Sequence, residues 1–125
     1  MSLSFRESSF PDLAPLIIQA ILDPHADKAS LELACDAAKH FGFAGLCTNL
    51  VRLPAARKRL CATGKTKLIA VIGFPFGAIP NTLKQAEAEW AAAHGAERLD
   101  IVPNFMHLEE GLMELFGEEL ANLSS

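Results

Sequence analysis

The sequence predicts an α/β fold in which parallel strands and helices alternate along the chain. Four short apolar runs are each followed by a segment with helical spacing or with helix-capping residues. Strands that are apolar on both faces are typical of a parallel sheet with helices packed over it. The 125 residues, of which 50% are hydrophobic and 21% are charged, allow one domain (1–125) with a real core.

The first strand is expected over 16–22, and residues 1–14 before it are expected to form an N-terminal extension or a short helix. The next helix can be capped by Asp27 and can stop at Gly42. Its apolar positions recur at helical spacing, namely Leu31, Cys35 and Ala38.

The second strand follows at once, over 43–48. A short helix is predicted over 52–61, with Pro54 near its first turn, where the missing N–H does no harm, and Gly64 lies beyond its end. The third strand is predicted over 68–73, which is apolar throughout.

Asn81 can cap a helix over 82–94, which is rich in Ala, Glu and Gln and is closed by Gly95. The fourth strand is expected over 98–102. A last helix is expected over 108–123 and ends the chain.

Asp100 stands out because it is a carboxylate within a run that otherwise indicates a buried strand. Burying an ionised carboxylate without a partner costs several kcal/mol, roughly, so we expect this one to be paired or used. Alternation along the strand places Asp100 on one face with Val102, and Leu99 and Ile101 on the other. Asp100 is therefore the first candidate for a catalytic residue.

Ligands of parallel α/β sheets meet the loops at the carboxyl ends of the strands. Three loops are candidates, namely Thr48-Asn49, Gly73-Phe74-Pro75-Phe76-Gly77 and Pro103-Asn104. A fourth segment, Gly64-Lys65-Thr66, resembles the end of a phosphate-binding P-loop, but it runs from a helix into a strand and lacks the earlier glycine.

The composition argues against several partner classes. A net charge of −4 and a pI near 5.5 do not favour nucleic acid, and the cluster formed by Arg52, Arg57, Lys58 and Arg59 is interpreted as a solvated helix face. Apolar runs such as the one at 16–18 are far too short to span a bilayer. No membrane and no nucleic acid are expected as partners.

The cysteines and histidines do not indicate a metal site. Cys35, Cys47 and Cys61 are too far apart for a CxxC pair, and their odd number argues against a disulfide framework. The four histidines lack the HxxxH or HxH spacing that would direct two imidazoles at one metal. We expect no bound metal and a cytoplasmic location.

Four segments together resemble the deoxyribose-phosphate aldolase family. They are the loop region Val71–Ala78 (VIGFPFGA), the helix segment at 84–88 (KQAEA), His94–Val102 (HGAERLDIV), and Phe43–Asn49 (FAGLCTN). The resemblance covers roughly positions 15–112 without a long gap. The combination of the GFPxGA loop with the later strand that carries the aspartate is specific, whereas each piece alone is only suggestive.

The resemblance implies a (β/α)8 TIM barrel, of which this chain covers about four βα units, the N-terminal half. It implies a lyase of deoxyribonucleotide and carbohydrate catabolism that cleaves 2-deoxy-D-ribose 5-phosphate to glyceraldehyde 3-phosphate and acetaldehyde through a lysine Schiff base, without metal or other cofactor. It assigns a catalytic, proton-handling role to Asp100 and a place beside the small phosphorylated sugar or aldehyde substrate to Cys47, Asn49, Phe74 and Asn104. For Cys47, simple core packing is the alternative that its residue type favours.

The chain departs from the family pattern in two ways. The first strand of the family carries Asp-His-Thr where this chain has Ile18, Gln19 and Ala20. The imine-forming lysine, its companion and the phosphate site belong to later strands that these residues do not include. The lysines present precede the third strand, at its amino end, or belong to helices, where we expect them on solvent faces; the latter are Lys28, Lys39, Lys58 and Lys84.

A half-barrel would expose two sheet edges and the inward faces of its strands, including Ile18, Ala20, Val71 and Val102. We therefore expect self-association or a complementing half-barrel, and we expect the chain to be a truncated form of a longer protein. Two functions stay open. The chain is either the half of an aldolase that contributes Asp100, inactive alone, or a non-catalytic interaction or scaffold domain descended from the aldolase.

Overall fold

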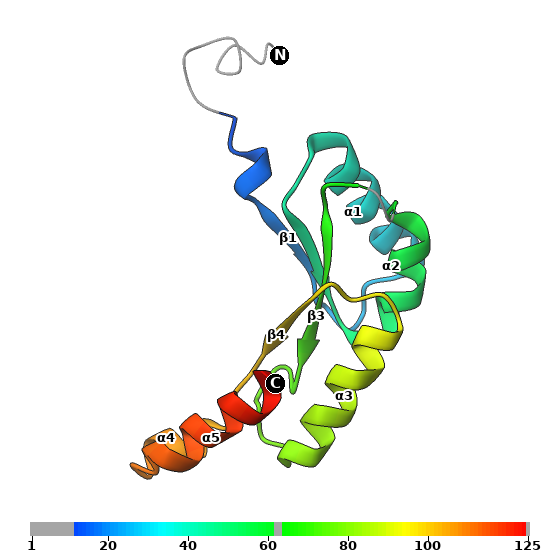
Figure 1. Cartoon of the computed structure of the whole chain (residues 1–125). Helices are drawn as coiled ribbons and strands as arrows, with labels where there is room; N and C mark the ends of the chain where they lie inside the picture. Colours follow the sequence, from blue (N-terminus) through cyan, green and yellow to red (C-terminus); the bar gives the residue numbers. More distant parts are fainter. Residues whose placement is uncertain (1–11, 62–63, 125) are drawn as a thin grey trace.

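The computed structural model describes residues 12–61 and 64–124 and contains one parallel sheet covered by helices (Figure 1). The strands follow one another in sheet order as they do in sequence, and each neighbouring pair is parallel. They are β1 (Ile18–Ile21), β2 (Gly45–Thr48), β3 (Lys67–Ile72) and β4 (Arg98–Ile101). The predicted α/β class with four βα units is confirmed.

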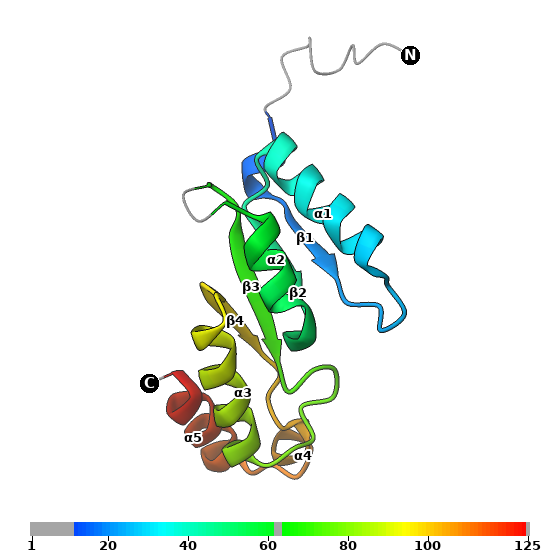
Figure 2. The ribbon, with the colours of Figure 1, turned by 90° about the vertical axis from the view of Figure 1, so that its right-hand side faces the viewer.

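The helices form an arc along one side of the curved sheet (Figures 1 and 2). Helix α1 packs against α2, and α3 packs against α5, which lies past α3 at the far end of the arc. The 3₁₀ and α-helices are η1 (Ala14–Leu16), α1 (Lys28–Phe41), η2 (Leu50–Arg52), α2 (Leu53–Arg59), α3 (Asn81–Ala93), α4 (Phe105–Glu109) and α5 (Met113–Ser124).

Local signals explain the limits of α1. The Asp27 carboxylate accepts a hydrogen bond from the Ser30 backbone N–H at 2.8 Å, which satisfies one free donor of the first turn. Gly42 ends the helix with a φ of 70°, a left-handed conformation that glycine adopts without strain. Both predicted ends are confirmed.

The predicted cap of α3 is wrong. Asn81 is the first residue of the helix, Pro80 occupies the capping position in an extended conformation, and no side chain caps the first turn. A proline fixes the extended entry into the helix and takes the place that a capping side chain would need.

The predicted C-terminal helix over 108–123 is also wrong, because two helices occupy this region. Asn104 caps α4 by accepting from the Met106 N–H at 3.0 Å, and Gly111 then reverses the chain with a φ of 75°. The Leu112 N–H donates to the His107 carbonyl at 2.7 Å and closes the turn before α5.

The first strand is shorter than predicted, since Leu16 belongs to η1 and β1 begins only at Ile18. Most of the predicted extension over 1–14 lies outside the described residues, so it stays a prediction. The other strands begin or end within two residues of their predicted limits.

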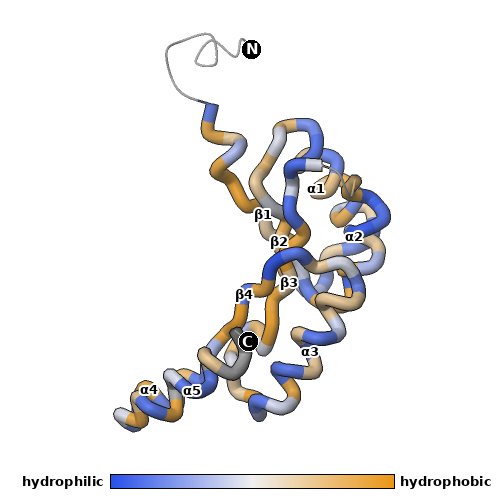
Figure 3. The backbone as a smooth tube through the Cα atoms, viewed as in Figure 1, coloured by the Kyte–Doolittle hydropathy of each residue, from blue (hydrophilic) through white to orange (hydrophobic). Residues whose placement is uncertain are grey.

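The sheet has a helix-covered outer face and a concave inner face. Side chains of the outer face join the helices in the main core, and Figure 3 shows β1, β2 and β3 as largely hydrophobic beside the more polar helices α1 and α2. The outer strand residues are Leu46, Leu68, Ala70 and Ile72. On the inner face, Cys47, Ile69 and Val71 form a smaller cluster against Leu22. This inner face holds the candidate site.

Candidate functional site

Two of the three candidate loops are joined at the carboxyl end of the sheet. Gly77, with a φ of 68°, packs so closely on the loop after β4 that a Cβ there would lie 2.1 Å from the Pro103 carbonyl oxygen. The Gly77 N–H donates to the Gly73 carbonyl at 2.7 Å, which keeps the 73–77 loop tight. Gly77 is therefore required by backbone packing between the loops after β3 and β4.

Asp100 lies on the inner face, as the strand alternation predicts, but the expectation that it is buried is wrong. The side chains of β4 alternate between exposed and half-buried, and Asp100 is one of the exposed residues. Its carboxylate faces the concave side of an edge strand, and no other described element covers it. The apolar sequence around Asp100 reflects contacts of Leu99 and Ile101 with the helix side.

Cys47 meets Asp100 across the intervening strand β3. The Cys47 thiol donates to Asp100 Oδ2 over 3.8 Å, and Cys47 is only 5% exposed. Burial raises the pKa of Cys47 to about 11, and the charge of the nearby Asp100 and the hydrogen bond to it act in the same direction. Cys47 is therefore a protonated donor to the carboxylate, not an activated nucleophile.

We expect Cys47 to resist alkylation until the pH approaches 11. In an iodoacetamide time course read by mass spectrometry, the exposed Cys61 reacts first at pH 8, whereas Cys47 stays unmodified in folded protein. Asp100→Asn removes a negative charge and a charged acceptor, so the pKa of Cys47 falls and its reaction begins at lower pH. Reaction of Cys47 as fast as that of Cys61 at pH 8 would contradict this assignment.

The same raised pKa links stability to pH. The folded state holds the Cys47 proton more tightly than the unfolded chain, whose thiol titrates near its ordinary value of 9.0. This contribution is present below pH 9 and is lost as the pH rises through about 11.

A buried ion pair beneath these loops was not anticipated by sequence reasoning. Lys84 is 0% exposed, and its Nζ lies 3.1 Å from Glu119 Oε1, so the expectation of a solvent-facing lysine is wrong. The same Glu119 oxygen accepts from the Asn104 backbone N–H at 2.6 Å. Glu87 similarly accepts from the Gly73 N–H at 2.8 Å. Side chains of α3 and α5 therefore fix the backbone of both loops.

Asn49, at the end of β2, is held by Arg52. The guanidinium donates to Asn49 Oδ1 at 2.6 Å and to the backbone carbonyls of the loop after β1, at Asp23 (2.6 Å) and Ala26 (3.0 Å). It is a clamp between two carboxyl-end loops.

The interpretation of the basic cluster as a solvated face is wrong at Arg52 and Arg57, which are half-buried, and is confirmed at Lys58 and Arg59, which are exposed. Arg52 forms this clamp, Arg57 pairs with Glu97 at 3.0 Å, and Arg59 forms two bonds of 2.8 Å to Asp36. Lys58 is exposed, as expected.

Arg52→Lys should destabilise the chain by about 2 kcal/mol, because a single ammonium cannot replace a planar fork that serves several carbonyls. The matched control is Arg98→Lys, at an exposed position, for which we expect a change within about 0.5 kcal/mol. Urea unfolding measures both. Equal effects of the two substitutions would show that the clamp contributes nothing to stability.

The other predicted substrate residues lie at the same end. Phe74 is 41% exposed in the loop after β3. Asn104 is at the loop after β4, but its side-chain oxygen is occupied as the cap of α4. The structure thus brings Cys47 and Asp100 into contact and places Asn49, Phe74 and Asn104 in the carboxyl-end loops; their roles toward a substrate stay predictions.

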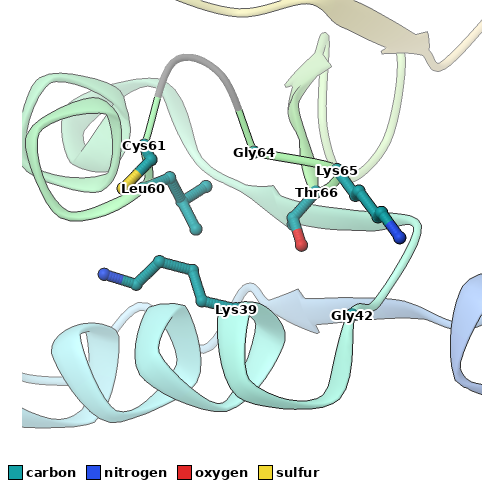
Figure 4. A pocket seen from close by; sticks show the side chains of 7 residues that line it. All are labelled: Lys39, Gly42, Leu60, Cys61, Gly64, Lys65 and Thr66. Atoms are coloured by element: carbon teal, nitrogen blue, oxygen red, sulfur yellow. The ribbon is translucent and has the colours of Figure 1, made fainter.

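A pocket of about 230 Å³ lies at the opposite, amino end of the sheet (Figure 4). Its amines do not converge, since Lys39 and Lys65 point to opposite sides of it and Lys39 Nζ is bound to the Arg59 carbonyl at 2.7 Å. In residues 12–61 and 64–124 we find no cluster of three His, Cys, Asp or Glu side chains arranged for a metal. Over the same residues, every helix is too short or too polar to cross a membrane.

Comparison with known proteins adds independent observations. No protein-family model matches the chain. A curated deoxyribose-phosphate aldolase of Cyanothece sp. is 37% identical over 112 residues, which covers 90% of this chain and 49% of the relative. The chain spans one third to one half of the length of the first curated relatives that it matches.

Two solved structures have the same arrangement of elements. An aldolase named QR15 is 29% identical with a TM-score of 0.84, and the match covers 91% of this chain and 50% of that one. The tetrameric deoxyribose phosphate aldolase of Aeropyrum pernix is 28% identical with a TM-score of 0.65, covering 86% of this chain and 48% of that one.

Proposed function

This chain belongs to the deoxyribose-phosphate aldolase family, as half of its α/β barrel, and from this membership we propose that it supplies one side of an aldolase site. In this proposal Asp100 is the proton-handling carboxylate and the carboxyl-end loops contact a small phosphorylated sugar or aldehyde. The observation that carries the proposal is the exposed carboxylate of Asp100 on the inner face, beside Cys47 and below the joined loops.

The chemistry of aldol cleavage explains why a carboxylate is useful there. A lysine amine condenses with the aldehyde carbon of 2-deoxyribose 5-phosphate and releases water, which gives an imine. A base then takes the proton of the 3-hydroxyl, the C2–C3 bond breaks, and its electron pair moves into the imine to form an enamine. Glyceraldehyde 3-phosphate leaves, and protonation and hydrolysis of the enamine release acetaldehyde. Asp100 is proposed to relay these protons.

The lysines of the chain do not supply the amine. All six lie within the described residues; Lys65 and Lys67 are at the amino end of β3, and the others belong to helices. Lys84 is the one buried lysine, and its Nζ lies against Glu119 Oε1 at 3.1 Å, on the helix side of the sheet and away from the inner face. We therefore propose that these 125 residues alone do not catalyse the cleavage.

Borohydride trapping tests this proposal on the chain itself. After incubation with acetaldehyde and sodium borohydride, we expect no stoichiometric reduced adduct on any lysine, and no acetaldehyde release from 2-deoxyribose 5-phosphate. Stoichiometric labelling of one lysine, with turnover lost when that lysine is replaced by Met, would overturn the proposal.

A test of the role of Asp100 requires an imine-forming lysine, which in this proposal comes from outside the chain. We would mix the chain with a fragment holding the part of the Cyanothece relative outside the match, where the family resemblance implies the lysine, and measure retro-aldol turnover of the assembled barrel. Asp100→Asn should lower kcat by about 10²-fold to 10⁴-fold, as expected for loss of a general acid or base. An assembled, active barrel in which Asp100→Asn has no effect would remove Asp100 from the mechanism.

A second candidate function is a non-catalytic interaction or scaffold domain, and the inner face of β1 favours it. Ile18 and Ala20 point into the concave side from this strand, where the family resemblance implies polar, carboxylate-bearing chemistry. If assembly with that fragment of the relative gives a folded barrel that binds no sugar phosphate, this second function gains. Both functions would involve self-association of the chain or pairing with a complementing half-barrel.

A cytoplasmic location is proposed from the unpaired cysteines.

A further inference from the structure

The two edges of the sheet are unpaired in the part of the chain that the structure describes. β1 hydrogen-bonds to β2 alone and β4 to β3 alone, so each edge presents a row of free backbone N–H and C=O groups. Native proteins rarely leave such edges open, because they template pairing with another strand.

Exposure on the inner face is concentrated at the same two edges. Ile18 on β1 is 43% exposed and Asp100 on β4 is exposed, whereas Cys47, Ile69 and Val71 on the central strands are 5%, 0% and 7% exposed. The three central residues pack on one another and on Leu22. The uncovered part of the inner face therefore lies beside its two edges, where a further strand would cover it.

Large apolar side chains also remain uncovered next to each edge. Leu16 and Ile17, immediately before β1, are 78% and 42% exposed. At the other edge, the α4–α5 hairpin that follows β4 exposes Phe105, Met106, Met113 and Leu115, at 49%, 56%, 59% and 45%. Helix α5 lies past α3 at that end of the helix arc, where the helix layer would continue over a further strand (Figures 1 and 2).

We propose that two copies of the chain associate edge to edge, β4 of each beside β1 of the other, and close an eight-stranded parallel barrel. A twofold axis along the barrel keeps all strands parallel and uses both edges of both copies, so no edge stays open. Four strands from each copy give the eight that such a barrel needs. β1 carries no charged residue, so it can approach Arg98 and Asp100 without like-charge repulsion.

The barrel geometry fixes which residues meet. Ile18, Gly45 and Lys67 form one row across the sheet, and the pairing of Ile69 with Arg98 extends this row to position 96 on the β4 side. In a closed barrel of this kind, the row of paired residues returns to the first strand displaced by about eight residues, the shear, and each half contributes about four of them. The row that begins at position 18 and reaches position 96 therefore continues at position 14 of the second copy, four residues before 18. Asp100 then lies beside Ile18 of the second copy. This second copy would complete the inner face on which the proposed site lies, but the inference rests on the barrel fold and not on the role of Asp100.

Sedimentation equilibrium of the 125-residue chain tests the association. We expect a dimer, and we expect Ile18→Asp to raise its dissociation constant by about a hundredfold or more, because a carboxylate would be buried beside Asp100 at both seams. The matched control is Leu33→Asp, which places the same charge at a 72% exposed position on α1 and should change the constant by less than about threefold. Circular dichroism checks that each variant is folded.

Cross-linking distinguishes edge pairing from other dimers and does not depend on the folding of Ile18→Asp. In a background with Cys47→Ala and Cys61→Ser, the pair Ile18→Cys and Asp100→Cys should form a covalent dimer on mild oxidation, since neighbouring strands lie within disulfide reach. Each variant that carries only one of the two introduced cysteines should stay uncross-linked, and the remaining Cys35 is buried. Three outcomes would overturn the proposal. The chain could be monomeric, it could associate only with the other half of a relative, or it could form a dimer that neither gives this cross-link nor responds to Ile18→Asp. None of these outcomes depends on catalytic activity, so failure here is distinct from failure of the aldolase proposal.

Discussion

Glu119→Gln is expected to destabilise the chain by about 3–5 kcal/mol, because it leaves the ammonium of Lys84 buried beside a neutral amide. Lys84 is 0% exposed, Glu119 is 1% exposed, and the pair joins α3 to α5. The control is Glu118→Gln, one residue away in the same helix, where the residue is exposed and the change should stay within about 0.5 kcal/mol. Urea unfolding followed by circular dichroism measures both.

A double substitution tests whether the lost stability comes from leaving one charge unpaired or from the loss of these particular side chains. Lys84→Met with Glu119→Leu removes both charges and keeps an apolar contact, so it should recover most of the stability that Glu119→Gln loses. The Asn104 N–H, which donates to Glu119, is left without its acceptor in the double variant and should exchange with solvent faster. A loss of less than about 1 kcal/mol in Glu119→Gln would show that Lys84 is not held as a buried cation.

The position of Lys84 illustrates what the sequence could and could not predict. A lysine is usually exposed, so its residue type favoured the solvent face of α3. Yet Lys84, Ala88 and Ala91 recur at i, i+4 and i+7, and the last two pack into the core, so helical spacing placed this lysine on the buried stripe. Its partner Glu119 could not be predicted, because it lies 35 residues later on a helix whose start the sequence misplaced.

Asp100 shows a different limit. Strand alternation correctly predicts which face of β4 carries the carboxylate, since this follows from the backbone alone. Its exposure depends on what covers that face, which is a property of packing between segments and not of the local pattern. The alternation of parallel strands and helices could be predicted for the opposite reason, because a helix follows each strand along the chain and such units place consecutive strands side by side.

Gly77→Ala should have the second large effect, because both the backbone conformation and the space around Gly77 exclude a side chain. A left-handed conformation costs an L-residue about 1–2 kcal/mol. In addition, the new Cβ would lie 2.1 Å from the Pro103 carbonyl oxygen and 2.8 Å from that of Val102. Backbone atoms cannot move aside as a flexible side chain can, so the loops after β3 and β4 must separate, and we expect a total loss of about 4 kcal/mol or more.

Gly42→Ala isolates the conformational part of this loss. Gly42 has nearly the same φ, 70° against 68°, but a Cβ there would meet nothing within 4 Å. Its substitution should therefore cost only about 1–2 kcal/mol, and the difference between the two variants measures the contact between the loops. If the two glycines tolerate alanine equally in urea unfolding, the loops are not in backbone contact. Because Asp100 directly precedes this junction on β4, the Gly77 variant should also shift the pH at which Cys47 is alkylated, whereas the Gly42 variant, at the far end of α1, should leave it unchanged.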